Sequence, residues 1–151
     1  MELTLNDYFG DSITLKPRVE LYSVRDYTGK EMPGLAIVFE TTDDIPEDYG
    51  VLTKCFGEMI GLKDCAYVDT NNFPHANQLL DAGIATDTGY TKHSGFCTYP
   101  LWHFNHEFLE ECGGAKYKRY SDAYEQYFSE EDDTEEEIDE PIQTSNGQQM
   151  K

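Results

Sequence analysis

Two stretches organise this sequence: DCAYVDTNNFPH (residues 64–75) and, after a short helical pattern, TGYTKHSGFCTYPLWHF (residues 88–104). Together they hold the only Trp of the chain and most of its distinctive polar residues. Residues 65–68 are mostly apolar, which predicts a short buried strand. Residues 69–72 read Asp-Thr-Asn-Asn, and such side chains bond nearby backbone amides in turns and helix caps. A helix is expected from Pro74, because Pro suits the first helical position.

The second stretch predicts a loop and then a strand. Residues 86–94 are mostly polar and include a glycine, which is typical of a loop. Residues 95–103 favour a strand, although Pro100 restricts it to an edge or a bulge. After it, Asn105 can cap a helix over residues 106–112.

The N-terminal part predicts a β-hairpin and a third strand. Residues 13–15, 19–24 and 35–41 are rich in β-branched and aromatic side chains. Residues 26–30 carry the chemistry of the turn between the two arms. Residues 49–56 contain Gly, Val and Thr, which disfavour a helix, so we expect a third strand there.

The C-terminal part predicts one more helix and a tail. Gly113 and Gly114 should end the helix before it, and residues 116–128 then space Tyr and Phe as an amphipathic helix does. Nine of the twelve residues 129–140 are acidic, and residues 129–151 carry little to bury, which predicts a disordered tail.

The expected fold is therefore a single α+β domain over residues 1–128. The segments predict one mainly antiparallel sheet of about four or five strands with two or three helices. A chain of 151 residues is long enough for one hydrophobic core of this kind.

The chain is strongly acidic, with 30 acidic against 11 basic residues and a formal net charge of −19. The tail contributes nine of the acids and one of the bases, so residues 1–128 still carry −11. This charge opposes direct binding to nucleic acid or to an anionic membrane. No apolar run is long enough to span a bilayer, and the first residues lack the pattern of a signal peptide, so we expect a cytoplasmic protein.

The cysteines and histidines do not form a recognisable metal motif. The four cysteines lack the Cys-x-x-Cys spacing of zinc sites and are interpreted as reduced, mostly buried thiols. His103 and His106 lack the His-Glu-x-x-His pattern, so a structural role is favoured. We predict no metal, no cofactor and no catalytic residue. The cysteines are Cys55, Cys65, Cys97 and Cys112.

Two clusters are candidates for binding a small ligand. At the expected strand-to-helix junction, polar side chains could collect a ligand, but a capping network explains them equally simply and is favoured. Along the segment Lys92–Tyr99, His93 and Cys97 would lie about 13 Å apart on a straight strand, too far to act together. The candidate ligand-binding residues are Asp69, Asn71, Asn72, His75, His93, Ser94 and Tyr99.

A third candidate is a run of acids in the loop after the second hairpin arm. Such a run is usually only a solvated face. The functional interpretation is that its carboxylates imitate the phosphates of DNA and occupy a basic groove on a nucleic-acid enzyme. The candidate partner-binding residues are Glu40, Asp43, Asp44, Glu47 and Asp48.

The motifs VDTNN (residues 68–72) and SGFCTYPL (residues 94–101), followed by Phe104, resemble an uncharacterised bacterial family catalogued as a domain of unknown function. Its members are small proteins of gut Firmicutes and their conjugative elements and phages. The resemblance covers roughly residues 10–112 and leaves the tyrosine-rich segment and the acidic tail outside. It implies no activity. It implies a mobile-element context, in which small acidic proteins often blunt host restriction or CRISPR defence.

Two functions of different class follow. The preferred one is a non-enzymatic interaction protein whose acidic surface binds a basic partner, such as a nucleic-acid-processing or defence enzyme. The alternative is a small-ligand-binding domain or enzyme that uses the junction Asp69–His75 and the segment Lys92–Tyr99. The sequence predicts neither the oligomeric state nor the identity of the partner.

Overall fold

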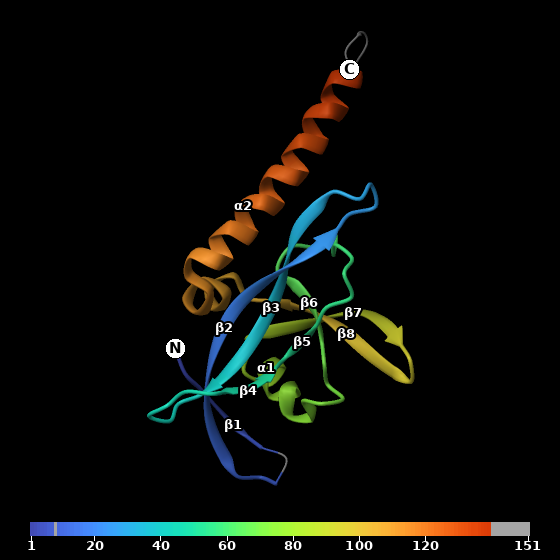
Figure 1. Ribbon diagram of the computed structural model, residues 1–151. Coiled ribbons are helices and arrows are strands. Elements are labelled where there is room, and N and C mark those ends of the chain that lie inside the picture. Colours follow the sequence, from blue (N-terminus) through green and yellow to red (C-terminus); the bar gives the residue numbers. More distant parts are fainter. Residues whose placement is uncertain (8, 140–151) are drawn as a thin grey trace. The chain divides into compact units, whose positions relative to one another are not determined.

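The computed structural model describes residues 1–7 and 9–139. The chain divides into two compact units, Met1–Tyr120 and Ser121–Lys151. The first unit contains eight strands in two antiparallel sheets of four strands each (Figure 1). The predicted α+β class is confirmed, but the strands form two sheets where one sheet was expected.

The first sheet has the strand order β1, β2, β3, β4. Its strands are β1 (Leu3–Asn6), β2 (Ser12–Arg25), β3 (Glu31–Thr41) and β4 (Asp48–Val51). The predicted hairpin is confirmed as the long pair β2 and β3, and β2 is one continuous strand. Asp26 forms the turn between them, because its Oδ1 accepts hydrogen bonds from the backbone N–H groups of Thr28 and Lys30.

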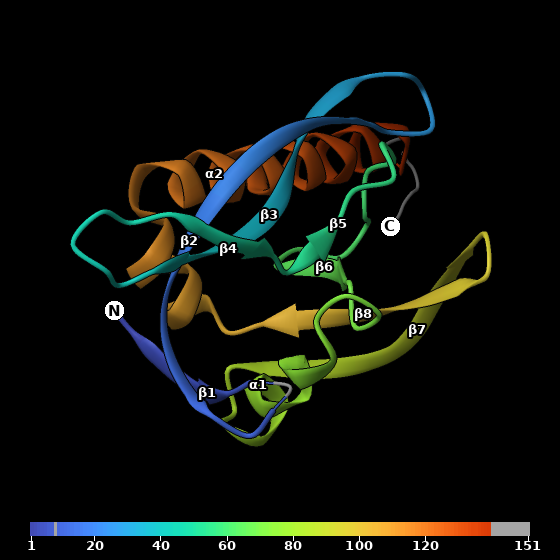
Figure 2. The ribbon, with the colours of Figure 1, turned by 60° about the horizontal axis from the view of Figure 1, so that its bottom comes forward.

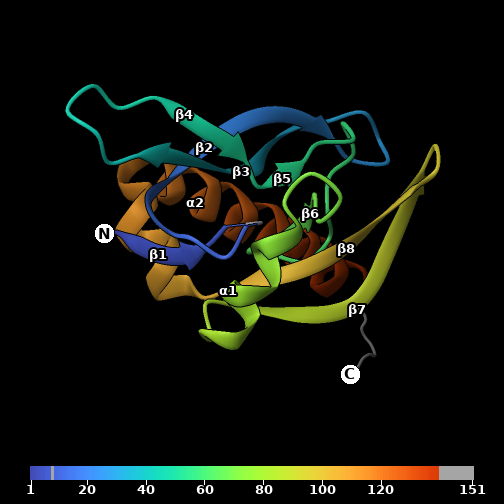
Figure 3. The ribbon, with the colours of Figure 1, turned by 90° about the horizontal axis from the view of Figure 1, so that it is seen from below.

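The second sheet has the strand order β5, β6, β8, β7. Its strands are β5 (Thr53–Lys54), β6 (Cys65–Val68), β7 (Ala85–Ser94) and β8 (Cys97–Phe104). The predicted strands at residues 65–68 and 95–103 are confirmed as β6 and β8. Figures 2 and 3 show β7 and β8 as a hairpin whose tip extends past the other strands of this sheet.

The predicted loop over residues 86–94 is wrong, because this segment is strand β7. Ser94 pairs with Cys97 across a two-residue turn, in which Gly95 has a φ of 61°. Most side chains of β7 are exposed on both faces, so the strand shows no alternation of polar and apolar residues. Backbone hydrogen bonds to β8 hold β7 in the sheet. The pattern of polar and apolar residues does not predict these hydrogen bonds.

The predicted third strand over residues 49–56 is divided between the two sheets at Leu52. β4 belongs to the first sheet and β5 to the second. Leu52 is fully buried, its N–H donates to the carbonyl of Ile37, and its own carbonyl accepts the N–H of Asp69. The backbone of Leu52 therefore connects β3 with the segment that follows β6 through hydrogen bonds.

Both sheets share one core. Phe39 on β3 packs against Phe73, which lies in the connection between β6 and η1 (Pro74–Ala76), with ring centroids 5.5 Å apart. Side chains of both sheets and of the helices are buried together within the first unit. Those with 0% or 1% exposure include Leu15, Ile37, Phe39, Leu52, Val68, Leu79, Trp102, Phe104, Leu109 and Tyr120.

The helices begin where the sequence predicts. The helix expected from Pro74 is a 3-10 turn, η1 (Pro74–Ala76), followed by α1 (Asn77–Asp81). α2 (His106–Asp139) follows Asn105, whose carbonyl accepts the N–H of Leu109. The Asn105 side chain instead donates to the carbonyl of Gly83, so it anchors the helix start to the loop after α1.

α2 is kinked at Gly114, which has φ 54° and ψ −129°. The predicted end of a helix at this position is therefore an interruption between two helical segments. The helical backbone of α2 continues through Asp139, within the segment for which the sequence predicts a disordered tail. Glu is a good helix former, which favours this continuation. The rest of the expected tail, residues 140–151, lies outside the described residues.

A buried hydrogen-bond network holds the kink. Asp64, 7% exposed, accepts a hydrogen bond from the Tyr117 hydroxyl at 2.9 Å, and its own N–H donates to the Tyr120 hydroxyl at 2.9 Å. His106 Nδ1 lies 2.9 Å from the same Tyr117 hydroxyl. Since His106 and Tyr117 stand on opposite sides of Gly114, the network joins both helical segments to the start of β6.

Candidate functional site

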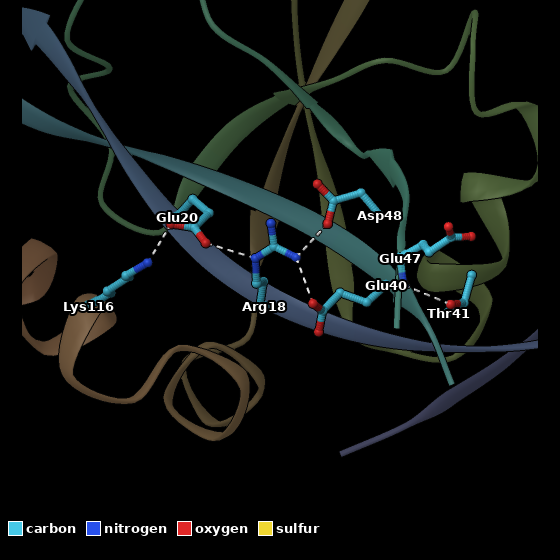
Figure 4. Close-up of polar contacts among 7 residues, drawn as sticks. All are labelled: Arg18, Glu20, Glu40, Thr41, Glu47, Asp48 and Lys116. Carbon is cyan, nitrogen blue, oxygen red and sulfur yellow. Dashed lines mark hydrogen bonds and ion pairs between the residues drawn. The ribbon is translucent and has the colours of Figure 1, made fainter. Parts of the chain in front are cut away.

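Arg18 on β2 gathers three of the acidic side chains near the β3–β4 connection (Figure 4). Its guanidinium lies 2.7 Å from Glu20, 3.0 Å from Glu40 and 2.9 Å from Asp48. Hydrogen bonds to Asp48 and Glu20 raise the pKa of Arg18, and those from Lys116 and Arg18 lower the pKa of Glu20. Two of the five predicted partner-binding acids, Glu40 and Asp48, are therefore ion-paired with Arg18 within the molecule.

The other three acids, Asp43, Asp44 and Glu47, are exposed in the connection between β3 and β4, and we call them the acidic loop. Thr41 closes this connection at its base. The Thr41 N–H donates to the Glu47 carbonyl at 2.8 Å, and the Glu47 N–H donates to the Thr41 hydroxyl at 3.0 Å. Figure 4 shows the Glu47 carboxylate turned away from Arg18. The acidic loop is thus a short, closed connection with its carboxylates in solvent.

The junction after β6 is held by its own hydrogen bonds. Asp69 accepts hydrogen bonds from the backbone N–H and the side-chain amide of Asn72, at 3.2 and 2.9 Å. The Asp69 carbonyl also accepts the N–H of Phe73. Asn71 is exposed beside them. The geometry is that of the turn-capping network, which the sequence favours over a ligand site at this position.

The His75 side chain makes ring contacts and takes no part in the hydrogen bonds that the structure describes at the junction. Its ring packs on Phe73 at 4.4 Å and near Tyr49 at 6.3 Å between ring centroids. Within the described residues, neither of its ring nitrogens has a hydrogen-bond partner, and burial lowers the pKa of His75. His75 therefore acts as part of an aromatic cluster.

The remaining candidates lie on the β7–β8 hairpin. His93 and Cys97 stand on neighbouring strands, so the expected 13 Å separation along one strand does not apply, because the hairpin turn lies between them. His93 Nδ1 lies 2.8 Å from the Thr98 hydroxyl, and Ser94 is exposed beside the turn. Tyr99 is buried, and this burial raises its pKa.

A cavity of about 470 Å³ lies next to these candidates, and none of the seven candidate ligand residues lines it. It is bounded by β2 at Tyr22, by the loop after β5, by Tyr67 on β6 and by Tyr90 on β7. The sequence analysis missed this site. The available signal was an apolar segment between β5 and β6, residues 59–62, whose Leu62 remains 46% exposed.

Residues 22–132 match the family model described as a domain of unknown function, DUF4313. The chain belongs to DUF4313. The DUF4313 match begins within β2 and reaches into α2, so it includes the tyrosine-rich residues 116–128 that the resemblance had left outside. No curated protein and no solved structure matches the chain.

Metal binding has no support in the part of this DUF4313 chain that the structure describes. Residues 1–7 and 9–129, whose side chains the structure describes, contain no group of three or more His, Cys, Asp or Glu side chains arranged to hold a metal ion. His106 Nε2 lies 3.1 Å from Glu110, one helical turn away, and its other nitrogen faces Tyr117. Within the same residues, no helix has the length and apolar character needed to cross a membrane.

The four thiols of this DUF4313 chain should differ sharply in reactivity. Cys55 is exposed, whereas burial raises the pKa of Cys65 and of Cys112 to about 11. Only about one in a thousand of these two thiols is ionised near pH 8, and the thiolate is the reactive form. Cys97 and Cys112 are half-buried, so only Cys65 is fully buried, where mostly buried thiols were expected. We expect Cys55→Ser to remove the fastest phase with Ellman's reagent, and Cys55→Ser with Cys97→Ser to leave only slow reaction. A fast phase that survives the double substitution would show that Cys65 or Cys112 is reactive.

Proposed function

We propose that this protein is a non-enzymatic interaction protein that binds a basic protein partner through the acidic loop. The observation that supports this proposal is the division of the acids around Arg18. Glu40 and Asp48 pair with Arg18, although Asp48 is itself exposed, whereas Asp43, Asp44 and Glu47 are exposed and lie outside this ion-pair cluster. The acidic loop can therefore meet a partner's lysines or arginines without first losing an internal ion pair.

The overall charge supports the same proposal. The sequence carries −19 in total and −11 on residues 1–128, so a positively charged partner is attracted at long range and its association is accelerated. The more specific form of the proposal is a DNA-mimic-like inhibitor of a host restriction or CRISPR enzyme, encoded by a mobile element and active in the cytoplasm. In this form the carboxylates compete with DNA phosphates for one basic groove.

The proposal is tested by removing the charges of the acidic loop. The wild-type protein is used to capture partners from host lysate at low salt, and the dissociation constant is then measured with the purified partner. We expect Asp43→Asn, Asp44→Asn and Glu47→Gln together to weaken binding about tenfold, because each surface ion pair contributes roughly 0.2–1 kcal/mol. Binding should also weaken as salt rises.

A matched control has the same change in net charge at other exposed positions: Glu2→Gln, Asp81→Asn and Glu111→Gln. This variant should retain most of the affinity. Equal losses in both variants would show that only the net charge matters, and no loss in either would contradict the acidic loop as the binding surface. For the specific form, the protein should release the partner from a DNA duplex.

A further inference from the structure

The cavity beside the β7–β8 hairpin has aromatic walls. Four aromatic residues line it: Tyr22, Phe56, Tyr67 and Tyr90. The other apolar lining residues are Met59, Ile60, Leu62 and Leu101, and Lys54, Glu58, Gly61 and Thr91 also line it. Its volume of about 470 Å³ lies in the range of sites that bind small molecules.

The loop that forms one wall of the cavity is held in place from two sides. On the β2 side, the N–H of Arg25 donates to the Gly57 carbonyl at 3.0 Å, and the N–H of Met59 donates to the Arg25 carbonyl at 2.8 Å. On the hairpin side, the Lys92 ammonium lies 2.8 Å from Glu58 and 5.2 Å from the centre of the Phe56 ring. The cavity is therefore formed before any ligand enters.

Phe56 is fixed by further ring contacts. Its centroid lies 5.6 Å from that of Tyr67 and 5.3 Å from that of Tyr99, both edge-on. Tyr90 differs, because its side chain is 63% exposed on β7. An aromatic ligand in the cavity would thus pack between the fixed ring of Phe56 and the exposed side chain of Tyr90.

The charged groups at the cavity are Lys54, Glu58 and the Lys92 that pairs with Glu58, and they sum to one positive charge, whereas the whole protein is negative. Two charged side chains line it, Lys54 and Glu58. Glu58 is paired with Lys92, whereas Lys54 is exposed and makes no ion pair with any other residue that the structure describes. Since charges are screened beyond about 8 Å at physiological salt, the ammonium of Lys54 outweighs the distant acids for a ligand inside the cavity.

We propose that this cavity binds a small ligand consisting of a flat aromatic ring that carries one anionic group. The ring lies among Tyr22, Phe56 and Tyr90, and the anionic group faces Lys54. Aromatic rings favour stacked or edge-on contacts with one another, and a carboxylate or phosphate forms a charge-assisted hydrogen bond to an ammonium. The residues involved are distinct from the acidic loop and from the candidate ligand residues of the junction and the hairpin.

Three probes distinguish the contribution of the aromatic ring to binding from that of the anionic group. Each is titrated into the full chain and followed by two-dimensional ¹H–¹⁵N NMR. Indole-3-acetate carries a carboxylate and adenosine 5′-monophosphate a phosphate, so they distinguish the two sources of the anionic group. Tryptamine has the indole ring with a positive charge. We expect indole-3-acetate or the nucleotide to shift the backbone amides of residues 54–62 and 90–91, with tryptamine at least about fivefold weaker.

Two variants test the assigned roles. Lys54→Glu should weaken the anionic probe about tenfold and reverse the preference, so that tryptamine binds more tightly. Tyr90→Ala should weaken both kinds of probe about threefold, because a ring contact is lost whatever the charge. The controls are Lys16→Glu and Tyr27→Ala, exposed residues outside the cavity lining that should leave binding unchanged. The same spectra show whether each variant is folded.

Three results would overturn the proposal: no shift at the cavity amides with any probe up to about 5 mM, a wild-type preference for tryptamine, or an unchanged preference in Lys54→Glu. This test can fail or succeed independently of the proposed binding of a basic partner by the acidic loop. Substituting Asp43, Asp44 and Glu47 should leave probe binding intact, whereas Tyr90→Ala should leave binding of a basic partner intact.

Discussion

Replacing Gly113 with Ala is expected to lower the free energy of unfolding by about 2–4 kcal/mol. A Cβ at this position would lie 2.5 Å from the Tyr117 Cβ and 2.9 Å from the Val19 Cγ2. Neither neighbour can move easily, because Tyr117 is buried in the hydrogen-bond network with Asp64 and Val19 lies within the β2–β3 ladder. The missing side chain at Gly113 allows α2 to approach β2.

Urea unfolding with three glycine variants separates packing from backbone strain. A Cβ at Gly114 would meet no atom within 4 Å, but φ 54° with ψ −129° is a conformation that glycine adopts far more readily than Ala, so Gly114→Ala should cost about 1–3 kcal/mol through backbone strain. Gly61 has neither a close neighbour nor a positive φ, so Gly61→Ala should cost least. If Gly113→Ala were no worse than Gly61→Ala, the close approach of α2 to β2 would be refuted.

The second large effect is expected at Asp64, where Ala should destabilise the protein by about 2–4 kcal/mol. The substitution removes the acceptor of the Tyr117 hydroxyl, which is buried, and places Ala at a φ of 66°. Asp is one of the few residues besides Gly that tolerate this backbone conformation. A lost hydrogen bond and a strained backbone therefore add together in this variant.

Other residues at position 64 separate the two contributions. Asn can adopt the same φ and offers a carbonyl oxygen to Tyr117, so it should lose only about 1 kcal/mol, the difference between a charged and a neutral acceptor. Gly relieves the strain but offers no acceptor, and should lie between Asn and Ala. The order is measured by urea unfolding. Ala at least as stable as Asn would mean that the hydrogen bond to Tyr117 contributes nothing.

A double-mutant cycle with Tyr117→Phe provides an independent check. Tyr117→Phe alone leaves the Asp64 carboxylate without this donor and His106 without this neighbour, which should cost about 1–3 kcal/mol. Once Asp64 is Ala, the same change should cost less, because the two residues contact each other directly. Additive costs would show that they act independently.

The acidic loop shows why a site was only partly predictable. The sequence identifies Glu40, Asp43, Asp44, Glu47 and Asp48 as an acidic run, but not that two of them pair with Arg18. Arg18 lies on another strand, and the β2–β3 register places it opposite Val38 and next to Glu40. Charge pairing across strands depends on that register, which the residue pattern does not determine.

The cavity was less predictable still. Its lining residues are distant in the sequence: Phe56 lies 34 positions after Tyr22, and Tyr90 lies 34 positions after Phe56. They come together only because the loop after β5 is hydrogen-bonded to the end of β2 and joined to β7 through Lys92 and Glu58. Each of these contacts is between residues distant in the chain.

The sequence by itself determined the local features: the turn at Asp26, the buried strand at residues 65–68, the helix starts at Pro74 and His106, and the interruption at Gly114. These depend on local apolar composition, turn residues, proline at a helix start and glycine at positive φ, which involve only neighbouring residues. Only the tertiary structure decided that Leu52 divides one apolar segment between two sheets and that the polar segment 85–94 is a strand. Strand pairing joins backbone segments that are distant in the sequence. The side-chain pattern of one segment therefore does not indicate which strand it pairs with.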